Sequence, residues 1–283
     1  MKRGVNSKRS QISLFIILGI VIVVAIGGLV YGLKIRNEAI SNEFFSSVEI
    51  RPQVENIESN VILCMHEISR DGLKQIGVQG GYYNKPGRFF DLNESFIPYY
   101  YYQGNFSMPD RDKVISELEN FIEDKVNVCF DELKFEGFDL EHNRASAKVF
   151  INNTEVGILI DSSFVIQKEG KRIVFNTKNF PVSQSSALSD ILEIAKYITD
   201  SHKIDSKYYC ISCVEKMAEE KDVYVQNIPF ADNSVLIIIG ENRTSDEPYL
   251  FSFLNKYNGY EIADDFALTG EFAEGVPGSL GVV

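Results

Sequence analysis

A long apolar run near the N-terminus is followed by segments in which apolar residues recur every three or four positions, or every two. Residues 14–33 contain no charged residue and are interrupted only by glycines and Tyr31. A helix of this length reaches about 30 Å, the thickness of a bilayer's hydrocarbon core. Because the run is apolar on every side, it predicts a transmembrane helix and disfavours a helix lying on a membrane surface. A secretory signal cleaved near Ala25–Gly27 remains an alternative to an uncleaved anchor.

Several later segments carry apolar residues at spacings of three and four, which is typical of helices that pack by one face. The first is Val54–Gly77. The second runs from about Pro109 to Phe130, with Ser107 as candidate cap and acidic residues in its first turn. Two more helices are predicted over Ser183–His202, capped by one of its serines, and over Tyr208–Glu220.

From Ala145 the apolar residues alternate with a period of two, which indicates strands. The stretches "ASAKVFI", "EVGILIDSSFVIQ" and "KRIVFNT" predict an antiparallel meander, and "DVYVQNIPF", "SVLIIIG" and "PYLFSFLNKY" predict three further strands. Helices and strands come in blocks, so the fold class is α+β. We expect one N-terminal transmembrane helix followed by an extracytoplasmic domain of helices and antiparallel β-meanders.

These patterns divide the chain into five segments, of which the fourth has candidate subdivisions near residues 143 and 205. The segments are a basic N-terminus (1–13), the transmembrane helix (14–33), a juxtamembrane linker (34–52), the α+β domain (53–262) and a loose tail (263–283).

Charge orients the apolar run and limits the partners. Four Lys/Arg residues and no acidic residue precede it, so the positive-inside rule places the N-terminus in the cytoplasm and the remainder outside. The whole chain has a net charge of -12, and an acidic surface argues against nucleic acid. The expected partners are the lipid bilayer, through residues 14–33, and a surface protein or glycan.

The residues just before the apolar run resemble a processing signal. Arg9, Ser10, Gln11 and Ser13 match the class III signal of archaeal type IV pilin-like proteins. The resemblance implies processing at Ser10 and Gln11 and assembly of a surface filament. Phe15 stands where that family has a glutamate, which in pilins is thought to meet the N-terminal amine of a neighbouring subunit.

A wider resemblance covers most of the chain. An anchor at Lys8–Gly19, a cysteine-bearing helix at Val54–Gly77, the Gly-Gly-Tyr segment Gly80–Tyr83 and the Tyr-rich stretch Ile97–Tyr102 follow one another in this order. This layout is similar to uncharacterised single-pass surface proteins of small-genome archaea. The resemblance implies a topology and carries no activity.

Four cysteines in an exported domain favour disulfides. Cys64 and Cys129 each lie on the apolar stripe of a predicted helix, so we expect a bridge between those helices. Cys210 and Cys213 form a Cys-x-x-Cys pair, which fits a local structural disulfide, two buried thiols or a redox pair. No second Cys/His pair has zinc-ligand spacing, so neither a metal nor a cofactor is predicted.

An aromatic-rich segment supplies the binding candidates. Residues 82–106 hold ten aromatic residues among glycines and prolines, which predicts loops or short strands. Exposed tyrosines suit recognition of sugars or protein surfaces, and the alternative is that they pack inward over the helix pair. The candidates are Tyr82, Tyr83, Tyr99, Tyr100, Tyr101 and Tyr102.

Four Asn-x-Ser/Thr sequons follow the apolar run, and an extracytoplasmic location makes them glycosylation candidates. Their asparagines are Asn93, Asn105, Asn152 and Asn242.

No catalytic motif is present, and the acids Glu117, Glu119, Glu123 and Asp124 are interpreted as the solvated face of a helix. We therefore expect a membrane-anchored protein of the cell envelope with a non-catalytic binding or scaffolding role. The alternatives are a pilin-like filament subunit and an envelope thiol-redox enzyme that uses the Cys210–Cys213 pair.

Overall fold

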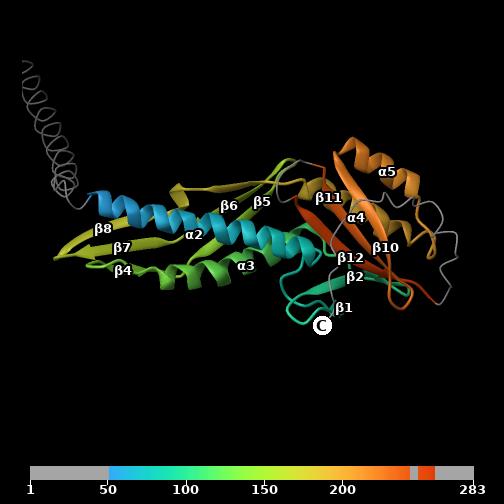
Figure 1. Ribbon diagram of the computed structural model, residues 1–283, viewed down its shortest axis with the longest axis horizontal. Helices are drawn as coiled ribbons and strands as arrows, with labels where there is room; N and C mark the ends of the chain where they lie inside the picture. The colour runs from blue at the N-terminus through green and yellow to red at the C-terminus, as the bar shows by residue number, and fades with distance from the viewer. Residues whose placement is uncertain (1–50, 243–247, 259–283) are drawn as a thin grey trace, which may run out of the picture.

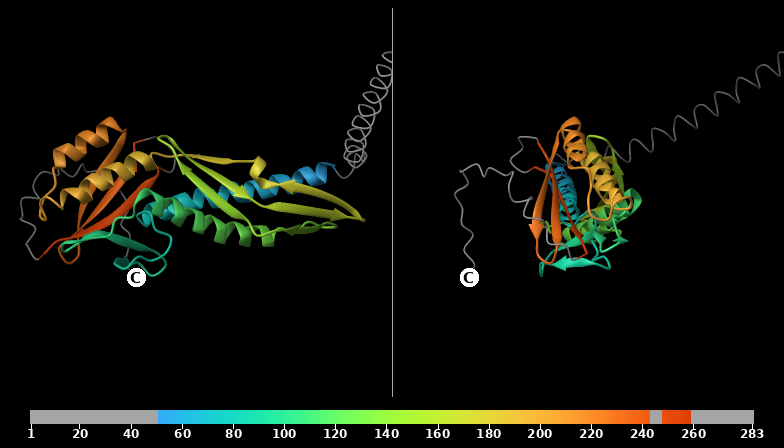
Figure 2. Two further views of the ribbon diagram at one scale, coloured as in Figure 1. Left: turned by 180° about the vertical axis from the view of Figure 1, so that it is seen from behind. Right: turned by 90° about the vertical axis from the view of Figure 1, so that its right-hand side faces the viewer.

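The computed structural model describes residues 51–242 and 248–258, and Figure 1 shows them as an elongated molecule with two parts. The stalk consists of helices α2 (Arg51–Val78) and α3 (Arg111–Glu132) with the strands that lie between residues 139 and 185. The head consists of the remaining strands and helices, and it lies at the end of the molecule opposite the start of α2 (Figures 1 and 2).

Part of the predicted topology falls outside these residues. Within the described part, no helix has both the length and the apolar composition needed to cross a bilayer. The predicted anchor 14–33, the signal residues Ser10 and Gln11, and the tail 263–283 all lie outside the described residues.

The two long helices of the stalk run antiparallel and bury their apolar stripes against each other and against the sheet (Figure 1). A disulfide joins Cys64 of α2 to Cys129 of α3, the pairing expected from the two stripes. It closes a loop with a sequence separation of 65 residues, which contributes about 4 kcal/mol in the chain-entropy model. Ser107 is not the cap of α3, because Asp110 is the N-cap and accepts from the Lys113 N–H at 2.8 Å.

The predicted antiparallel meander is confirmed, and each of its three strands is broken near its middle. Ser162 alone separates β6 from β7, so the sheets β5-β6-β9 and β4-β7-β8 are two halves of one three-stranded meander. The buried Thr177 hydroxyl holds the break by accepting from the Ser162 N–H at 2.8 Å. The strand bounds are β4 Asp139–His142, β5 Ser146–Ile151, β6 Glu155–Asp161, β7 Ser163–Lys168, β8 Lys171–Asn176 and β9 Val182–Ser185, with the short helix η1 at Thr177–Asn179.

Side chains of α3 occupy the free edge of β5. Glu119, Glu123 and Asn127 are spaced by four residues, about 6 Å along a helix, and alternate N–H groups of a strand are spaced by about 6.6 Å. The spacing of these helix side chains therefore matches the spacing of alternate N–H groups along the strand. The three side chains accept from the N–H groups of Val149, Ala147 and Ala145 at 3.0, 2.9 and 2.8 Å, respectively. The interpretation of Glu119 and Glu123 as a solvated face is wrong, because both carboxylates pair with this strand edge.

The head is built on a sheet of order β1-β2-β12-β11-β10, and the short β3 pairs with β2. All pairs are antiparallel except β12 with β2. Helices α4 (Leu188–Ser201) and α5 (Ile211–Glu220) lie together beside this sheet, and α5 packs against β10 (Figures 1 and 2). The strands are β1 Phe89–Asp91, β2 Phe96–Tyr102, β3 Asn105–Phe106, β10 Val223–Phe230, β11 Ser234–Glu241 and β12 Leu250–Lys256.

The helix predicted over Ser183–His202 begins later than its sequence suggests. Ser183–Ser185 belongs to β9, where it pairs with β6, and α4 begins at Leu188 after the N-cap Ala187. The serines are drawn into the sheet because β6 would otherwise present an unpaired edge. The cap residue makes no side-chain cap hydrogen bond.

Replacing Asn127 with alanine should destabilise the stalk. Its amide accepts from the Ala145 N–H and donates to the Ala145 carbonyl at 3.2 Å, so its loss leaves edge groups unpaired at a cost of about 1–3 kcal/mol. The matched control is Asn120→Ala, an exposed asparagine on the same helix, which should change stability by less than about 0.5 kcal/mol. Chemical denaturation measures both, and equal losses would contradict the role of Asn127.

Candidate functional site

Three of the six tyrosines proposed as a recognition surface are core residues. Tyr99, Tyr100 and Tyr101 are 8%, 0% and 1% exposed, and their strand β2 lies inside the sheet, with β12 on one side and β1 and β3 on the other. Tyr100 stacks on Phe253 at 4.2 Å between ring centroids. As folded, these three tyrosines cannot contact a ligand, so the alternative of inward packing holds for them. Tyr102 is partly exposed, with the Arg88 guanidinium 4.6 Å from its ring centroid.

Tyr82 and Tyr83 are half-buried and join the head to α3. The Tyr82 hydroxyl donates to the Ser107 carbonyl at 2.8 Å, and burial, with the nearby Glu117 charge, raises the pKa of Tyr82 to about 12. Glu117 is itself buried and accepts from the N–H groups of Tyr83 and Asn84 at 2.9 and 2.8 Å. Glu117 is therefore a junction residue and no part of a solvated face.

Burial opposes the charge on Glu117, but its partners outweigh this effect. The Lys113 ammonium lies 2.6 Å from one carboxylate oxygen. This contact and the two backbone N–H donors hold the pKa of Glu117 below its ordinary value. The contacts of the Glu117 carboxylate are all structural, which argues against a role for it in acid–base chemistry.

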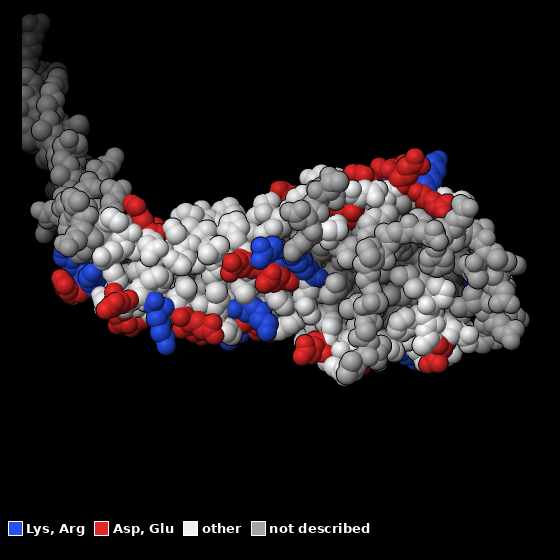
Figure 3. All heavy atoms as spheres, viewed as in Figure 1, with Lys and Arg blue, Asp and Glu red and all other residues white. Residues whose placement is uncertain are grey.

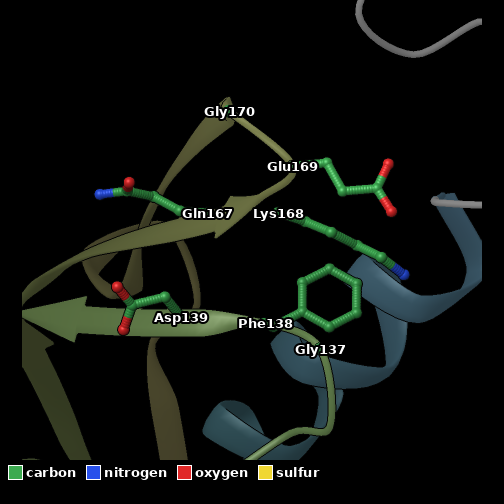
Figure 4. Close-up of a pocket in the computed structure, with 7 residues that line it drawn as sticks. All are labelled: Gly137, Phe138, Asp139, Gln167, Lys168, Glu169 and Gly170. Atoms are coloured by element: carbon green, nitrogen blue, oxygen red, sulfur yellow. The ribbon is translucent and has the colours of Figure 1, made fainter.

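One surface hollow of about 390 Å³ lies at the turn between β7 and β8, at the end of the stalk where α2 begins (Figure 4). Lys168 lies beside the Phe138 ring, 4.5 Å from its centroid, and donates to the Gln53 Oε1 at 2.8 Å. Figure 4 shows Lys168 pointing toward α2, whereas Gln167 and Asp139 point away from it. These contacts tie the hairpin tip to the first turn of α2, so we assign this hollow a bracing role.

A second hollow of about 530 Å³ forms a groove in the head between α4 and the start of α3. Apolar side chains from Phe106, Met108, Pro109 and Leu192 provide part of its lining. Phe106 is 40% exposed, so part of its ring is open to a ligand. The remaining lining residues are Asp110, Arg111, Ser189, Glu193, Lys196, Thr199, Asp200 and Lys203.

The charges of this groove are largely neutralised within it. Asp200 accepts from Lys196 and lies 2.5 Å from the Lys203 ammonium, and these two cations lower the pKa of Asp200. Arg111 differs, because it donates to the Ser189 hydroxyl at 3.3 Å and to the Ile151 carbonyl and forms no ion pair with a carboxylate of the described residues. The groove thus combines an apolar lining with one guanidinium that retains capacity for an anionic group.

Nothing in the sequence marks this groove. Its residues come from β3, the start of α3 and α4, which only the fold brings around one hollow. The spacing of charges four apart on α4, at Lys196 and Asp200, is a common feature of exposed helices and does not mark a site.

The second cysteine pair lies at the surface of the head. Cys210 and Cys213 are joined in a disulfide with 5.2 Å between their Cα atoms. Cys210 is the N-cap of α5, and its sulfur accepts from the Cys213 N–H at 3.2 Å. Cys210 is exposed and Cys213 is half-buried, so the alternative of two buried thiols is wrong.

The four sequon asparagines Asn93, Asn105, Asn152 and Asn242 all have exposed side chains. Their glycosylation remains a prediction.

His202 has a structural role in the head. His202 is buried, stacks on Tyr101 at 4.7 Å between ring centroids, and contacts Asn255 at 3.2 Å. Burial lowers the pKa of His202, so this ring stays neutral near pH 7. Among residues 51–242 and 248–258, no group of three His, Cys, Asp or Glu side chains converges to hold a metal ion.

The chain matches no family model, no curated protein and no solved structure.

Proposed function

We propose that this protein is a single-pass membrane protein that holds a binding head outside the cytoplasm on a stiff stalk, with a non-catalytic binding or scaffolding role. Support for the location comes from the apolar run 14–33 and the basic residues before it. Both disulfides fit an oxidising compartment.

The observation that carries the proposal is the construction of the stalk. Helix α2 has 28 residues and is therefore about 42 Å long. It is paired with α3, cross-linked at Cys64 and Cys129, and braced along its length by the meander (Figures 1 and 2). Such a spacer keeps the head at a fixed distance from Arg51, which is a mechanical property suited to display.

The head groove is our proposed contact surface for a neighbouring surface protein. Its apolar lining and the guanidinium of Arg111 suit an extended protein segment that carries an apolar side chain next to a carboxylate. The face of the molecule in Figure 3 has acidic and basic side chains interspersed along the stalk and no large area of a single sign.

The anchor is tested by N-terminal mass analysis of the protein in the membrane fraction. We expect the mature chain to retain residues 1–10 and to be released by detergent but not by high salt or alkaline washing. A chain that begins at Gln11 would favour the pilin-like alternative, and one that begins near Gly28 would contradict the anchor.

The groove is tested by replacing Phe106 with a photoreactive phenylalanine analogue in the full-length protein and irradiating intact cells. The matched control is the same replacement at Phe150, which is 54% exposed on stalk strand β5. We expect a discrete cross-linked protein from position 106 and none from position 150. Equal adducts from both positions, or none from either, would contradict the groove as the contact surface.

A further inference from the structure

The two disulfides of this protein differ in accessibility and in what they can stabilise. Cys64 is 3% exposed, and its bridge closes a long loop between the stalk helices. Cys210 is exposed, and its bridge to Cys213 spans a sequence separation of only 3. A cross-link between near neighbours removes little freedom from the unfolded chain. Packing of the buried Val214 and Ala218 already holds α5 in place, so stability explains the second disulfide poorly.

The Cys210 sulfur lies where a thiolate would be stabilised. It is at the N-terminal end of a helix of 10 residues that has no acidic residue in its first turn, so the helix dipole favours negative charge there. The Cys213 N–H donates to this sulfur, and the Ser212 hydroxyl lies 3.6 Å from it. Cys213 is half-buried, so an incoming thiolate reaches Cys210 first.

The surroundings of Cys210 offer a contact area for another protein. Tyr208 is 69% exposed and Ile211 is 38% exposed, so apolar side chains flank the exposed sulfur on both sides along the chain. The intervening Tyr209 is anchored instead, because its hydroxyl donates to the Asn227 Oδ1 at 2.6 Å. This anchor fixes the approach to the disulfide while Tyr208 and Ile211 remain open to a partner.

We propose that Cys210 and Cys213 form an exchangeable disulfide that oxidises a pair of thiols on a partner protein. A partner thiolate attacks the Cys210 sulfur and breaks the bond to Cys213, which leaves as a thiolate and takes up a proton. The partner's second thiol then attacks its own sulfur in the mixed disulfide and releases Cys210. Two electrons pass from the partner dithiol to this pair. Of the two protons that the dithiol loses, Cys213 takes up one and the solvent takes up the other, and stabilisation of the released Cys210 thiolate favours that direction.

The first test uses the full-length protein in detergent and a peptide that contains two reduced cysteines. We expect one peptide disulfide to form per protein molecule, with Cys210 and Cys213 becoming available to alkylation while Cys64 and Cys129 stay bonded. Circular dichroism should show a folded protein throughout. A peptide that remains reduced, or a Cys210–Cys213 bond that opens only when the protein unfolds, would overturn the proposal.

Two pairs of variants separate exchange from a structural role. The free Cys210 of Cys213→Ser should react with an oxidised peptide about tenfold faster at pH 7 than the free Cys213 of Cys210→Ser. Ile211→Ser should slow disulfide transfer to a reduced protein several-fold, whereas Ile228→Ser, at a similar 40% exposure on β10, should not. Equal rates within the cysteine pair would contradict the assignment of Cys210 as the attacked sulfur.

Discussion

The free edge of strand β5 is the constraint on which the stalk depends. An edge strand presents unpaired N–H groups that invite pairing with other chains unless something covers them. Here Glu119, Glu123 and Asn127 of α3 accept from alternate N–H groups of that edge. One set of contacts therefore closes the sheet, fixes the direction of α3 along it, and joins the helical layer to the β-layer.

The same helix, α3, also positions the head. A short segment, residues 107–110, joins β3 to the start of α3, and the buried Glu117 holds the backbone of Tyr83 and Asn84 against the helix. Arg111, the residue after the cap Asp110, donates to the carbonyl of Ile151 at the end of β5 and also lines the head groove. Stalk and head are thus continuous through α3, so displacement of this helix would alter the groove.

Much of the fold could be predicted from the sequence because its helices and strands follow local patterns of apolar residues. The helices near Val54–Gly77 and Pro109–Phe130 and the strands from Ala145 follow patterns of 3.6 and two residues. The Cys64–Cys129 bridge followed from the positions of both cysteines on apolar stripes. The predictions that were wrong concern contacts between residues that are distant in sequence. Nothing local shows that β2 pairs with β12 and so buries Tyr100, or that Glu123 faces a strand edge instead of water.

The candidate sites also differ in whether they could be predicted from the sequence. The Cys210–Cys213 pair was visible as a motif, and the structure adds its exposure and its place at the start of α5. The groove was invisible, since it exists only where α4 meets the start of α3. Motifs with chemistry within four residues can be found from sequence, whereas surfaces assembled from separate elements require the fold.

Hydrogen exchange at the edge of β5 tests the central constraint most directly. The amides of Ala147 and Val149 should exchange as slowly in the native protein as that of Lys148, whose residue pairs with Leu159 of β6. Rapid exchange at Ala147 and Val149, with Lys148 still protected, would show that α3 does not close the sheet.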